Sequence, residues 1–131
     1  MNREIKFRVW NKLTKQYIKN NIIISLDGKV KEVFFGEING EEPDCIIQQF
    51  TSLKDKNNKE IYEGDIVKCP DLNPPEYTNT LSIVEYHASC FCYRDISSNK
   101  IEPIYGFIRL SEQDDDGEII GNIFENPELL K

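Results

Sequence analysis

Apolar and polar residues alternate along the first ten positions, with the period of two that is typical of a β-strand. Three apolar side chains share one face of this strand: Ile5, Phe7 and Val9. The other face carries two basic side chains and one aromatic side chain: Lys6, Arg8 and Trp10. The pattern therefore predicts a strand with one buried face and one basic-aromatic face. A turn over 11–15 and a short return strand from Tyr17 are expected after it.

A β-hairpin is predicted around Asp27-Gly28, because this dipeptide separates the β-rich runs NIIISL and KVKEVFF. Gly28 supplies the positive φ that such a turn requires. The next segment, residues 36–44, is polar and rich in turn formers, so it is expected to be a loop. We expect this loop to separate an N-terminal region from the main domain.

Two tight turns are predicted within residues 50–68, after a strand over 45–50. The asparagine pair at 57–58 fits the tip of the first turn, because asparagine tolerates the left-handed backbone region. The sequence EGD at 63–65 predicts the second turn, which leads into the strand IVKC. Three prolines within 70–79 indicate a loop after that strand.

The longest β-like run covers residues 80–96, and neither parity within it is purely apolar. We therefore expect one strand that bends or changes faces midway. A further strand is predicted over 101–111, where Pro103 indicates a sheet edge or a bulge. The acidic sequence DDD at 114–116 predicts a solvated loop before the last strand, IIGNIF.

The final residues predict a short helix, with Asn126 as its N-cap and Pro127 at its first position. Strands at regular short spacing with glycine and proline turns favour a small barrel or sandwich. The chain is therefore expected to be mainly β.

Length and composition place the chain among ordinary globular proteins. Its 131 residues suffice for one domain with a core. Its apolar runs are shorter than a membrane span, and its first twelve residues lack the apolar segment of a secretory signal. The four cysteines are therefore expected to be reduced thiols in a cytosol: Cys45, Cys69, Cys90 and Cys92.

Charge is distributed unevenly along the chain. Residues 1–68 carry 12 basic and 11 acidic groups, a balance of +1, whereas residues 69–131 carry 4 basic and 12 acidic groups, a balance of −8. The net charge of −7 disfavours a protein that coats nucleic acid broadly. It leaves room for a local basic patch, or for association of a basic surface with an acidic one.

Three segments resemble the YopX family of phage and prophage proteins: REIKFRVWN at 3–11, FTSLKDKNNKEIYEGDIVK at 50–68 and EIIGNIFENPELL at 118–130. One departure is Asn58, which stands where that family commonly has glycine. Four residues of these segments are expected to have structural roles: Gly64, Asp65, Asn126 and Pro127.

The resemblance implies an SH3-type small β-barrel that is often oligomeric. It implies no activity, so no catalytic residue is carried over from it. We expect residues 1–44 to form a strand-and-hairpin region and residues 45–131 to form the barrel. The alternative is one continuous domain over 1–131.

Two sets of side chains are candidates for metal binding. The first holds four carboxylates whose spacing matches no EF-hand, so a solvated turn is the favoured interpretation: Asp55, Glu60, Glu63 and Asp65. The second combines Cys90, Cys92 and His87 with Cys45 or Cys69. Structural zinc usually takes two close cysteine pairs, and one is present here, so buried thiols are favoured. Nucleophilic catalysis by His87 with a cysteine lacks any motif context. We therefore expect no metal, no cofactor and no enzymatic activity.

Lys6, Arg8 and Trp10 are the candidate nucleic-acid-binding residues, because bases stack on aromatic rings while basic groups contact phosphates. The competing interpretation is a solvated strand face with Trp10 packed at its end. The favoured function is a non-enzymatic phage or prophage accessory protein that self-associates or binds a host or phage protein. A nucleic-acid-binding small barrel is the alternative, and no membrane interaction is expected.

Overall fold

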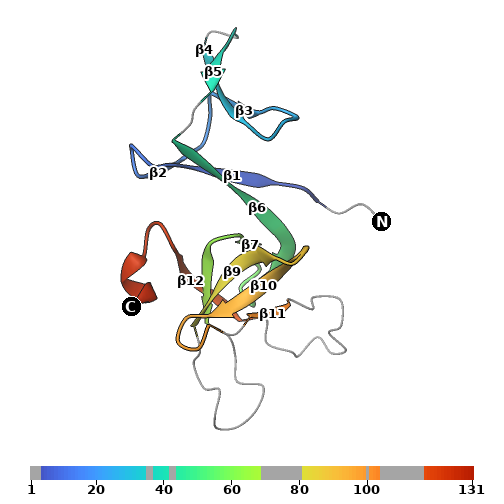
Figure 1. Cartoon of the computed structure of the whole chain (residues 1–131), viewed down its shortest axis with the longest axis vertical. Coiled ribbons are helices and arrows are strands. Elements are labelled where there is room, and N and C mark those ends of the chain that lie inside the picture. The colour runs from blue at the N-terminus through green and yellow to red at the C-terminus, as the bar shows by residue number, and fades with distance from the viewer. Residues whose placement is uncertain (1–3, 35–36, 42–43, 69–80, 100, 104–116) are drawn as a thin grey trace. The chain divides into compact units, whose positions relative to one another are not determined.

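The computed structural model describes residues 4–34, 37–41, 44–68, 81–99, 101–103 and 117–131, which form strands and a single short helix (Figure 1). The prediction of a mainly β protein is confirmed. By its contacts the chain divides into two compact units, Lys6–Gln49 and Met1–Ile5 with Phe50–Lys131. The predicted boundary at residue 44 stays a prediction. The loops predicted at 70–79 and 112–118 lie outside the described residues, apart from the last two positions of the second.

The unit Lys6–Gln49 contains an antiparallel arrangement around its first strand. Strand β1 (Phe7–Asn11) pairs with β2 (Gln16–Ile18) and with the first part of β6 (Cys45–Lys54). The predicted return strand at Tyr17 is thus confirmed. Burial of the apolar face is only partly as predicted, because Val9 is buried whereas Ile5 and Phe7 are exposed.

A three-stranded antiparallel sheet completes this unit, in the order β3-β4-β5. Its strands are β3 (Ile22–Ile24), β4 (Val30–Phe34) and β5 (Glu37–Glu41). The predicted hairpin is confirmed, since Gly28 has a φ of +82° and donates its N–H to the Ser25 carbonyl at 2.8 Å. The loop predicted over 36–44 is wrong at 37–41, where β5 pairs with β4 through a register shift at Lys31/Glu32, and residues 36, 42 and 43 lie outside the described residues.

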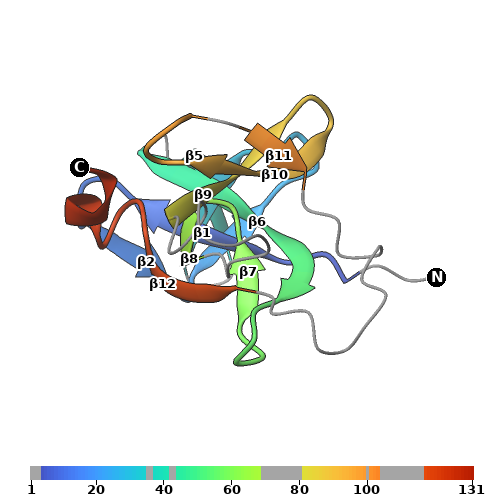
Figure 2. The same cartoon turned by 90° about the horizontal axis from the view of Figure 1, so that it is seen from below.

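The unit Phe50–Lys131 is built on a five-stranded antiparallel sheet in the order β11-β10-β9-β8-β12. Its strands are β8 (Asp65–Lys68), β9 (Leu81–His87), β10 (Cys90–Asp95), β11 (Ile101–Pro103) and β12 (Glu118–Asn122). Figure 2 shows β8 and β12 side by side, as their pairing requires. Pro103 lies on edge strand β11, as predicted, where its missing N–H costs no ladder bond.

The core of this unit lies where three buried side chains meet: Ile61, Val67 and Val84. Leu53, Tyr93 and Ile119 pack against them. Strand β6 extends to Lys54, beyond its predicted end, with Ser52 at a φ of +72° where the register with β7 (Glu60–Tyr62) shifts. This bulge lets β6 continue where turn formers predicted a loop.

The single strand expected over 80–96 is wrong: it is a hairpin. Strands β9 and β10 pair with His87 opposite Cys90, which leaves Ala88 and Ser89 as a two-residue turn. Both have positive φ, 50° and 69°. A turn with two positive φ values normally contains asparagine or glycine, so the residue types at 88 and 89 do not predict it.

The predicted C-terminal helix is present as one 3-10 turn, Pro127–Leu130, with Pro127 in its first turn. Asn126 stands at the N-cap position, as predicted, but its side chain makes no capping hydrogen bond. Its Oδ1 instead accepts the Asn122 N–H at 3.2 Å. That oxygen lies 2.5 Å from where a Cβ on Gly121 would stand, so a glycine at 121 makes room for it.

Candidate functional site

Arg8, Tyr17 and Gln48 are joined by hydrogen bonds on the face that the sequence predicted to be basic and aromatic. The Arg8 Nε donates to Gln48 Oε1 at 2.7 Å, and the Tyr17 hydroxyl donates to the same oxygen at 2.8 Å. The Arg8 guanidinium also lies over the Tyr17 ring, 4.8 Å from its centroid. The register of β1 with β6, which places Arg8 opposite Gln48, brings these groups together.

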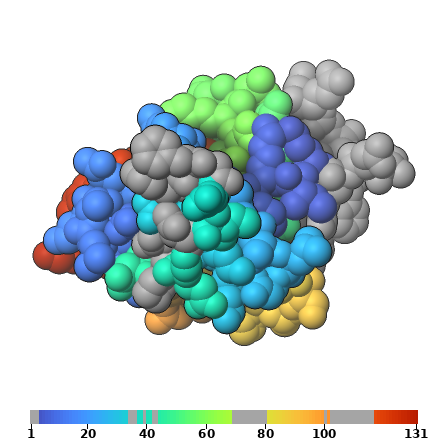
Figure 3. All heavy atoms as spheres, turned by 90° about the horizontal axis from the view of Figure 1, so that it is seen from above, coloured from blue at the N-terminus to red at the C-terminus, as the bar shows by residue number. Residues whose placement is uncertain are grey.

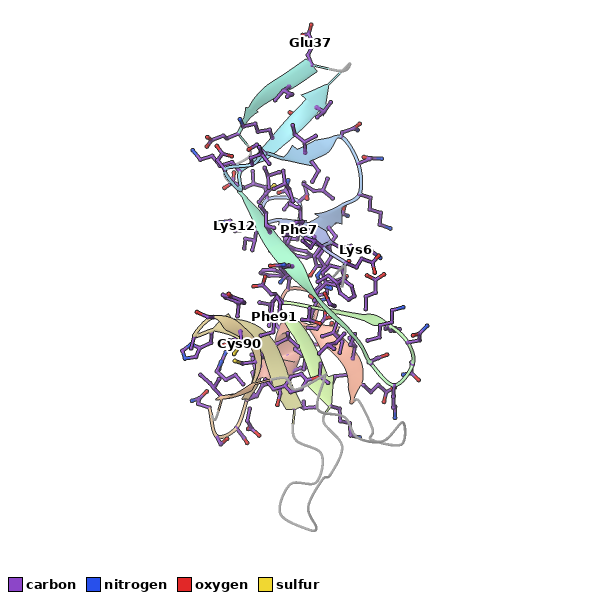
Figure 4. The ribbon with its side chains drawn as sticks, turned by 90° about the vertical axis from the view of Figure 1, so that its right-hand side faces the viewer. Lys6, Phe7, Lys12, Glu37, Cys90 and Phe91 are labelled. Atoms are coloured by element: carbon purple, nitrogen blue, oxygen red, sulfur yellow. The ribbon has the colours of Figure 1, made fainter. Side chains whose placement is uncertain are left out.

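Trp10 belongs to the same cluster but is not an open stacking surface. Its ring meets the Tyr17 ring edge-on, with centroids 5.0 Å apart, and the residue is only 6% exposed. A nucleic-acid base has no room to stack on it in this conformation. Trp10 is thus packed, as the competing interpretation of this face has it, and nucleic-acid binding by Lys6, Arg8 and Trp10 stays a prediction. Lys6 is half-buried, and Figure 4 shows it next to Phe7 near the start of β1.

Asp55 organises the first of the two turns that were predicted within residues 50–68. Its Oδ1 accepts the N–H groups of Asn57 and Lys59, both at 2.9 Å, and its Oδ2 accepts the N–H of Ile119 at 3.0 Å. Burial of the carboxylate raises its pKa, but these backbone hydrogen bonds outweigh that effect, so the pKa of Asp55 lies below its ordinary value. Asp55 is 4% exposed, so the predicted solvated turn is corrected at this residue.

Gly64 and Asp65 belong to the second of these turns, the one predicted from EGD at 63–65. Gly64 has a φ of +83°, its N–H donates to the Val84 carbonyl at 2.8 Å, and its carbonyl accepts the Ile123 N–H at 2.9 Å. Asp65 is buried, and its Oδ2 accepts the Tyr62 N–H at 2.8 Å. Through these two hydrogen bonds the turn before β8 is joined to β9 and to the residue that follows β12. Asn58 has the positive φ predicted for it, 66°.

Two of the four carboxylate candidates for metal binding, Asp55 and Asp65, accept hydrogen bonds from these backbone amides. In the part of the chain that the structure describes, no three His, Cys, Asp or Glu side chains gather as metal ligands would. Cys69 lies outside that part, Cys45 is half-buried on β6, and His87 is exposed at the end of β9. Of the second predicted set, the described part of the chain thus brings together Cys90 and Cys92.

The two thiols of Cys90 and Cys92 are adjacent, with their Sγ atoms 3.5 Å apart. Each lies near the His87 carbonyl oxygen, at 3.5 Å and 3.7 Å. Burial raises the pKa of the Cys92 thiol, and the neighbouring Cys90 raises it further. Figure 4 shows Cys90 and Phe91 at the end of the β9–β10 hairpin.

Two cross-strand contacts on this hairpin were not predicted. Tyr86 and Phe91 are register partners whose rings meet edge-on, with centroids 5.3 Å apart. On the other face, Arg94 Nη2 lies 2.7 Å from Glu85 Oε1. Both pairs depend on the Ala88-Ser89 turn, so a signal for that turn was needed to find them.

A family model described as "YopX protein" matches residues 6–131 of this chain. The chain belongs to the YopX family. This YopX-family chain is also similar to two solved structures. The first is protein EF1440 from Enterococcus faecalis, with 25% identity and a TM-score of 0.61 over 99% of this chain and 100% of that one. The second is protein yopX from Bacillus subtilis, with 20% identity and a TM-score of 0.60 over 95% of each chain.

The family assignment made from three sequence segments is thereby confirmed, and the second likeness supports the fold alone. A search of the curated proteins found no match. Among the described residues of this YopX-family chain, no helix is long and apolar enough to cross a membrane.

Proposed function

We propose that this YopX-family protein is a non-enzymatic binding protein that acts by associating with further copies of itself. The observation that supports the proposal is an apolar sheet face that is open to solvent in the unit Lys6–Gln49. We name it the open sheet face and define it by Ile23, Val33 and Ile38. Figure 3 shows atoms of β3, β4 and β5, in light blue to teal, at the surface.

The strand register places these three side chains on one side of the sheet. Val33 is opposite Ile38, and Ile23 is opposite Lys31, which shares a face with Val33 because it lies two residues away on β4. Ile38 is 61% exposed and Ile23 is also exposed. The aliphatic stem of Lys31 extends the same surface.

The opposite side of the sheet carries Ile22, Ile24 and Val30, of which Val30 is buried. This side thus holds a buried side chain, whereas the open sheet face holds two exposed isoleucines and the half-buried Val33. A β-sheet of three short strands gains stability when a second layer covers its apolar face. Leu26, at the adjoining turn, is fully exposed and adds to the apolar surface that a second layer covers.

A second copy of the chain is the occupant that the charge distribution favours. The first 68 residues carry a balance of +1 and the remainder a balance of −8. In a homo-oligomer whose open sheet faces meet, the contact forms between segments of small net charge, so like-charge repulsion opposes it weakly. Because the face is small, we expect reversible association that depends on protein concentration.

Sedimentation equilibrium tests this function with the wild type, Ile38→Lys and Ile120→Lys. Ile120 is a matched control, because it is also an exposed strand isoleucine but lies on β12. We expect a mass above the monomer for the wild type and for Ile120→Lys, and a shift to the monomer for Ile38→Lys. A wild type that stays monomeric at the highest concentration reached, or an Ile38→Lys variant that associates normally, contradicts the proposal.

The same proposal includes the fold type and origin that the family resemblance implies. We assign Phe50–Lys131 to an SH3-type barrel, an assignment supported by its short antiparallel strands around one core. The protein is then a phage or prophage accessory protein that works without a cofactor in the cytoplasm of a bacterial host. Among the described residues, Cys45, Cys90 and Cys92 are in no disulfide, which agrees with a reducing compartment.

A further inference from the structure

Cys90 and Cys92 form a thiol pair that the proposed function does not use. They are two residues apart on β10, so their side chains leave the same face of the strand. Their Sγ atoms are 3.5 Å apart, which is about 1.5 Å farther than the S–S distance of a disulfide. Rotation of the two side chains brings the sulfurs closer, and a change in the backbone at this end of the hairpin completes their approach to bonding distance.

The two thiols differ in their access to solvent. Cys90 is half-buried at the first position of β10, directly after the positive-φ residue Ser89, whereas Cys92 is 2% exposed. A reagent in solution therefore meets Cys90 first. The raised pKa of Cys92 points in the same direction, because the thiolate is the attacking species and Cys92 forms it less readily.

The charges around Cys90 and Cys92 favour an uncharged disulfide over a dithiolate that binds a metal ion. Glu85 is the cross-strand partner of Cys92, and its carboxylate is held by Arg94 Nε at 2.8 Å. A buried dithiolate with a soft metal ion needs further ligands, and the described residues bring no third side chain of the required kind. A disulfide carries no charge and needs no further ligand.

We propose that Cys90 and Cys92 are a reversible dithiol–disulfide site whose co-reactant is a low-molecular-weight disulfide. The Cys90 thiolate attacks one sulfur of that disulfide, and the first small thiol leaves with the electron pair. Cys92, once deprotonated, attacks the Cys90 sulfur and displaces the second small thiol. The two cysteines lose two electrons and two protons in total, and the small disulfide gains them as two thiols.

Strand geometry explains why the disulfide is reversible. Residues two apart on an extended strand have Cα atoms about 6.6 Å apart, near the upper end of the range that a disulfide spans. The closed form is therefore strained, and strained disulfides are reduced easily. The two-residue turn beside Cys90 allows the end of the hairpin to twist when the bond forms.

The test uses the full chain carrying Cys45→Ser and Cys69→Ser, so that Cys90 and Cys92 are the remaining thiols. The protein is equilibrated with mixtures of reduced and oxidised glutathione, quenched in acid, alkylated after denaturation and weighed by mass spectrometry. We expect a species that has lost both alkylation sites and two hydrogens, and that dithiothreitol returns to the dithiol. Persistence of two alkylatable thiols at every ratio contradicts the proposal, as does a covalent dimer.

Single variants in the same background test the order of attack. Cys92→Ser is expected to stop at a stable glutathione adduct on Cys90, because no resolving thiol remains. Cys90→Ser is expected to react at least about tenfold more slowly in the native protein, since Cys92 is buried. Equal rates in the two variants contradict the assigned order. An adduct that also persists when both cysteines are present contradicts the disulfide itself.

Discussion

Individual carboxylates and glycines stabilise the turns within residues 50–68, the middle segment of the family resemblance. Asp55 is the residue with the largest such role, because its two oxygens accept three backbone N–H groups from two separate segments. Hydrogen bonds to a charged acceptor are worth about 1.5–3 kcal/mol each, and a buried amide left without its acceptor costs a similar amount. The acidic, lysine-rich turn is thus fixed by a buried anion.

Asp55→Asn is expected to lower the free energy of unfolding by about 3 kcal/mol, because the amide places an NH₂ group against at least one backbone N–H. Urea denaturation followed by circular dichroism measures the loss. Asp27→Asn is the matched control at an exposed turn, where asparagine before Gly28 suits the hairpin. The control is expected to stay within about 0.5 kcal/mol of the wild type. An equal loss at both sites contradicts the role of burial.

The depressed pKa of Asp55 also predicts how its contribution depends on pH. The folded-state pKa lies below the ordinary value of 3.8, so the unfolded state binds more protons in the interval between the two values. The stabilisation is fully present above pH 4 to 5 and is lost as pH falls through the folded-state pKa. The stability difference between wild type and Asp55→Asn should therefore shrink as the pH falls below about 4. A difference that is constant over this range contradicts the assignment.

Hairpins and strand ends are the elements that depend on unusual backbone positions. The β9–β10 hairpin places alanine and serine where both residues have positive φ. Residues with a Cβ pay roughly 1–2 kcal/mol for the left-handed region, whereas glycine pays almost nothing. Strand β12 has the reverse situation at Gly121, where crowding by Asn126 and not φ requires a glycine.

Replacing Ala88-Ser89 by Asn-Gly is expected to raise the free energy of unfolding by about 1 kcal/mol, because these residues accept the observed turn without strain. Thermal unfolding measures the gain. Ser98→Gly is the control, since Ser98 lies in a turn without a positive φ, and it should lower stability or leave it unchanged. A loss of stability in the Asn-Gly variant shows that the turn is not of this type.

Gly121→Ala is expected to destabilise the fold by about 1–3 kcal/mol, because the new methyl group displaces the Asn126 side chain and breaks its bond to the Asn122 N–H. Gly40→Ala is the control, because its Cβ meets no atom within 4 Å. In the double variant with Asn126→Ala, part of the loss should return. Strict additivity of the two single changes contradicts the clash.

The molecule as a whole divides into two compact units, and its charge is divided unevenly along the sequence as well. An apolar open sheet face on one unit and an acidic second half of the chain imply different responses to salt. Apolar association depends weakly on ionic strength, whereas contacts between basic residues and phosphates weaken steeply with it.

The association constant for self-association is therefore expected to change less than about threefold between 50 mM and 500 mM salt, as measured by sedimentation. Fluorescence anisotropy with labelled single-stranded DNA and RNA provides the comparison for Lys6 and Arg8. Nucleic-acid binding becomes the favoured function if the protein binds these probes at low salt, if that binding falls steeply with added salt, and if it disappears in Lys6→Glu/Arg8→Glu. Self-association that is lost at high salt contradicts an apolar interface.

Much of the local structure was accessible from the sequence. The period of two around β1, the Asp27-Gly28 hairpin and the positive φ of Gly64 and Asn58 were predicted, because each depends on residues that are neighbours in the chain. Strand β5 and the β9–β10 hairpin were missed. In both cases pairing with an adjacent strand outweighed the local preference of residues such as Gly40 and Ala88.

The sequence by itself determined the mainly β class, the family and the identity of the turn residues, since backbone preferences and alternation act over a few positions. The tertiary structure alone decided which distant groups meet. The third amide on Asp55 belongs to Ile119, 64 residues away, and Trp10 is closed off by Tyr17 across a strand pair. The approach of Cys90 to Cys92 also required a turn that no residue type announced. These contacts arise from register and sheet order, which depend on packing over the whole chain and not on any single segment.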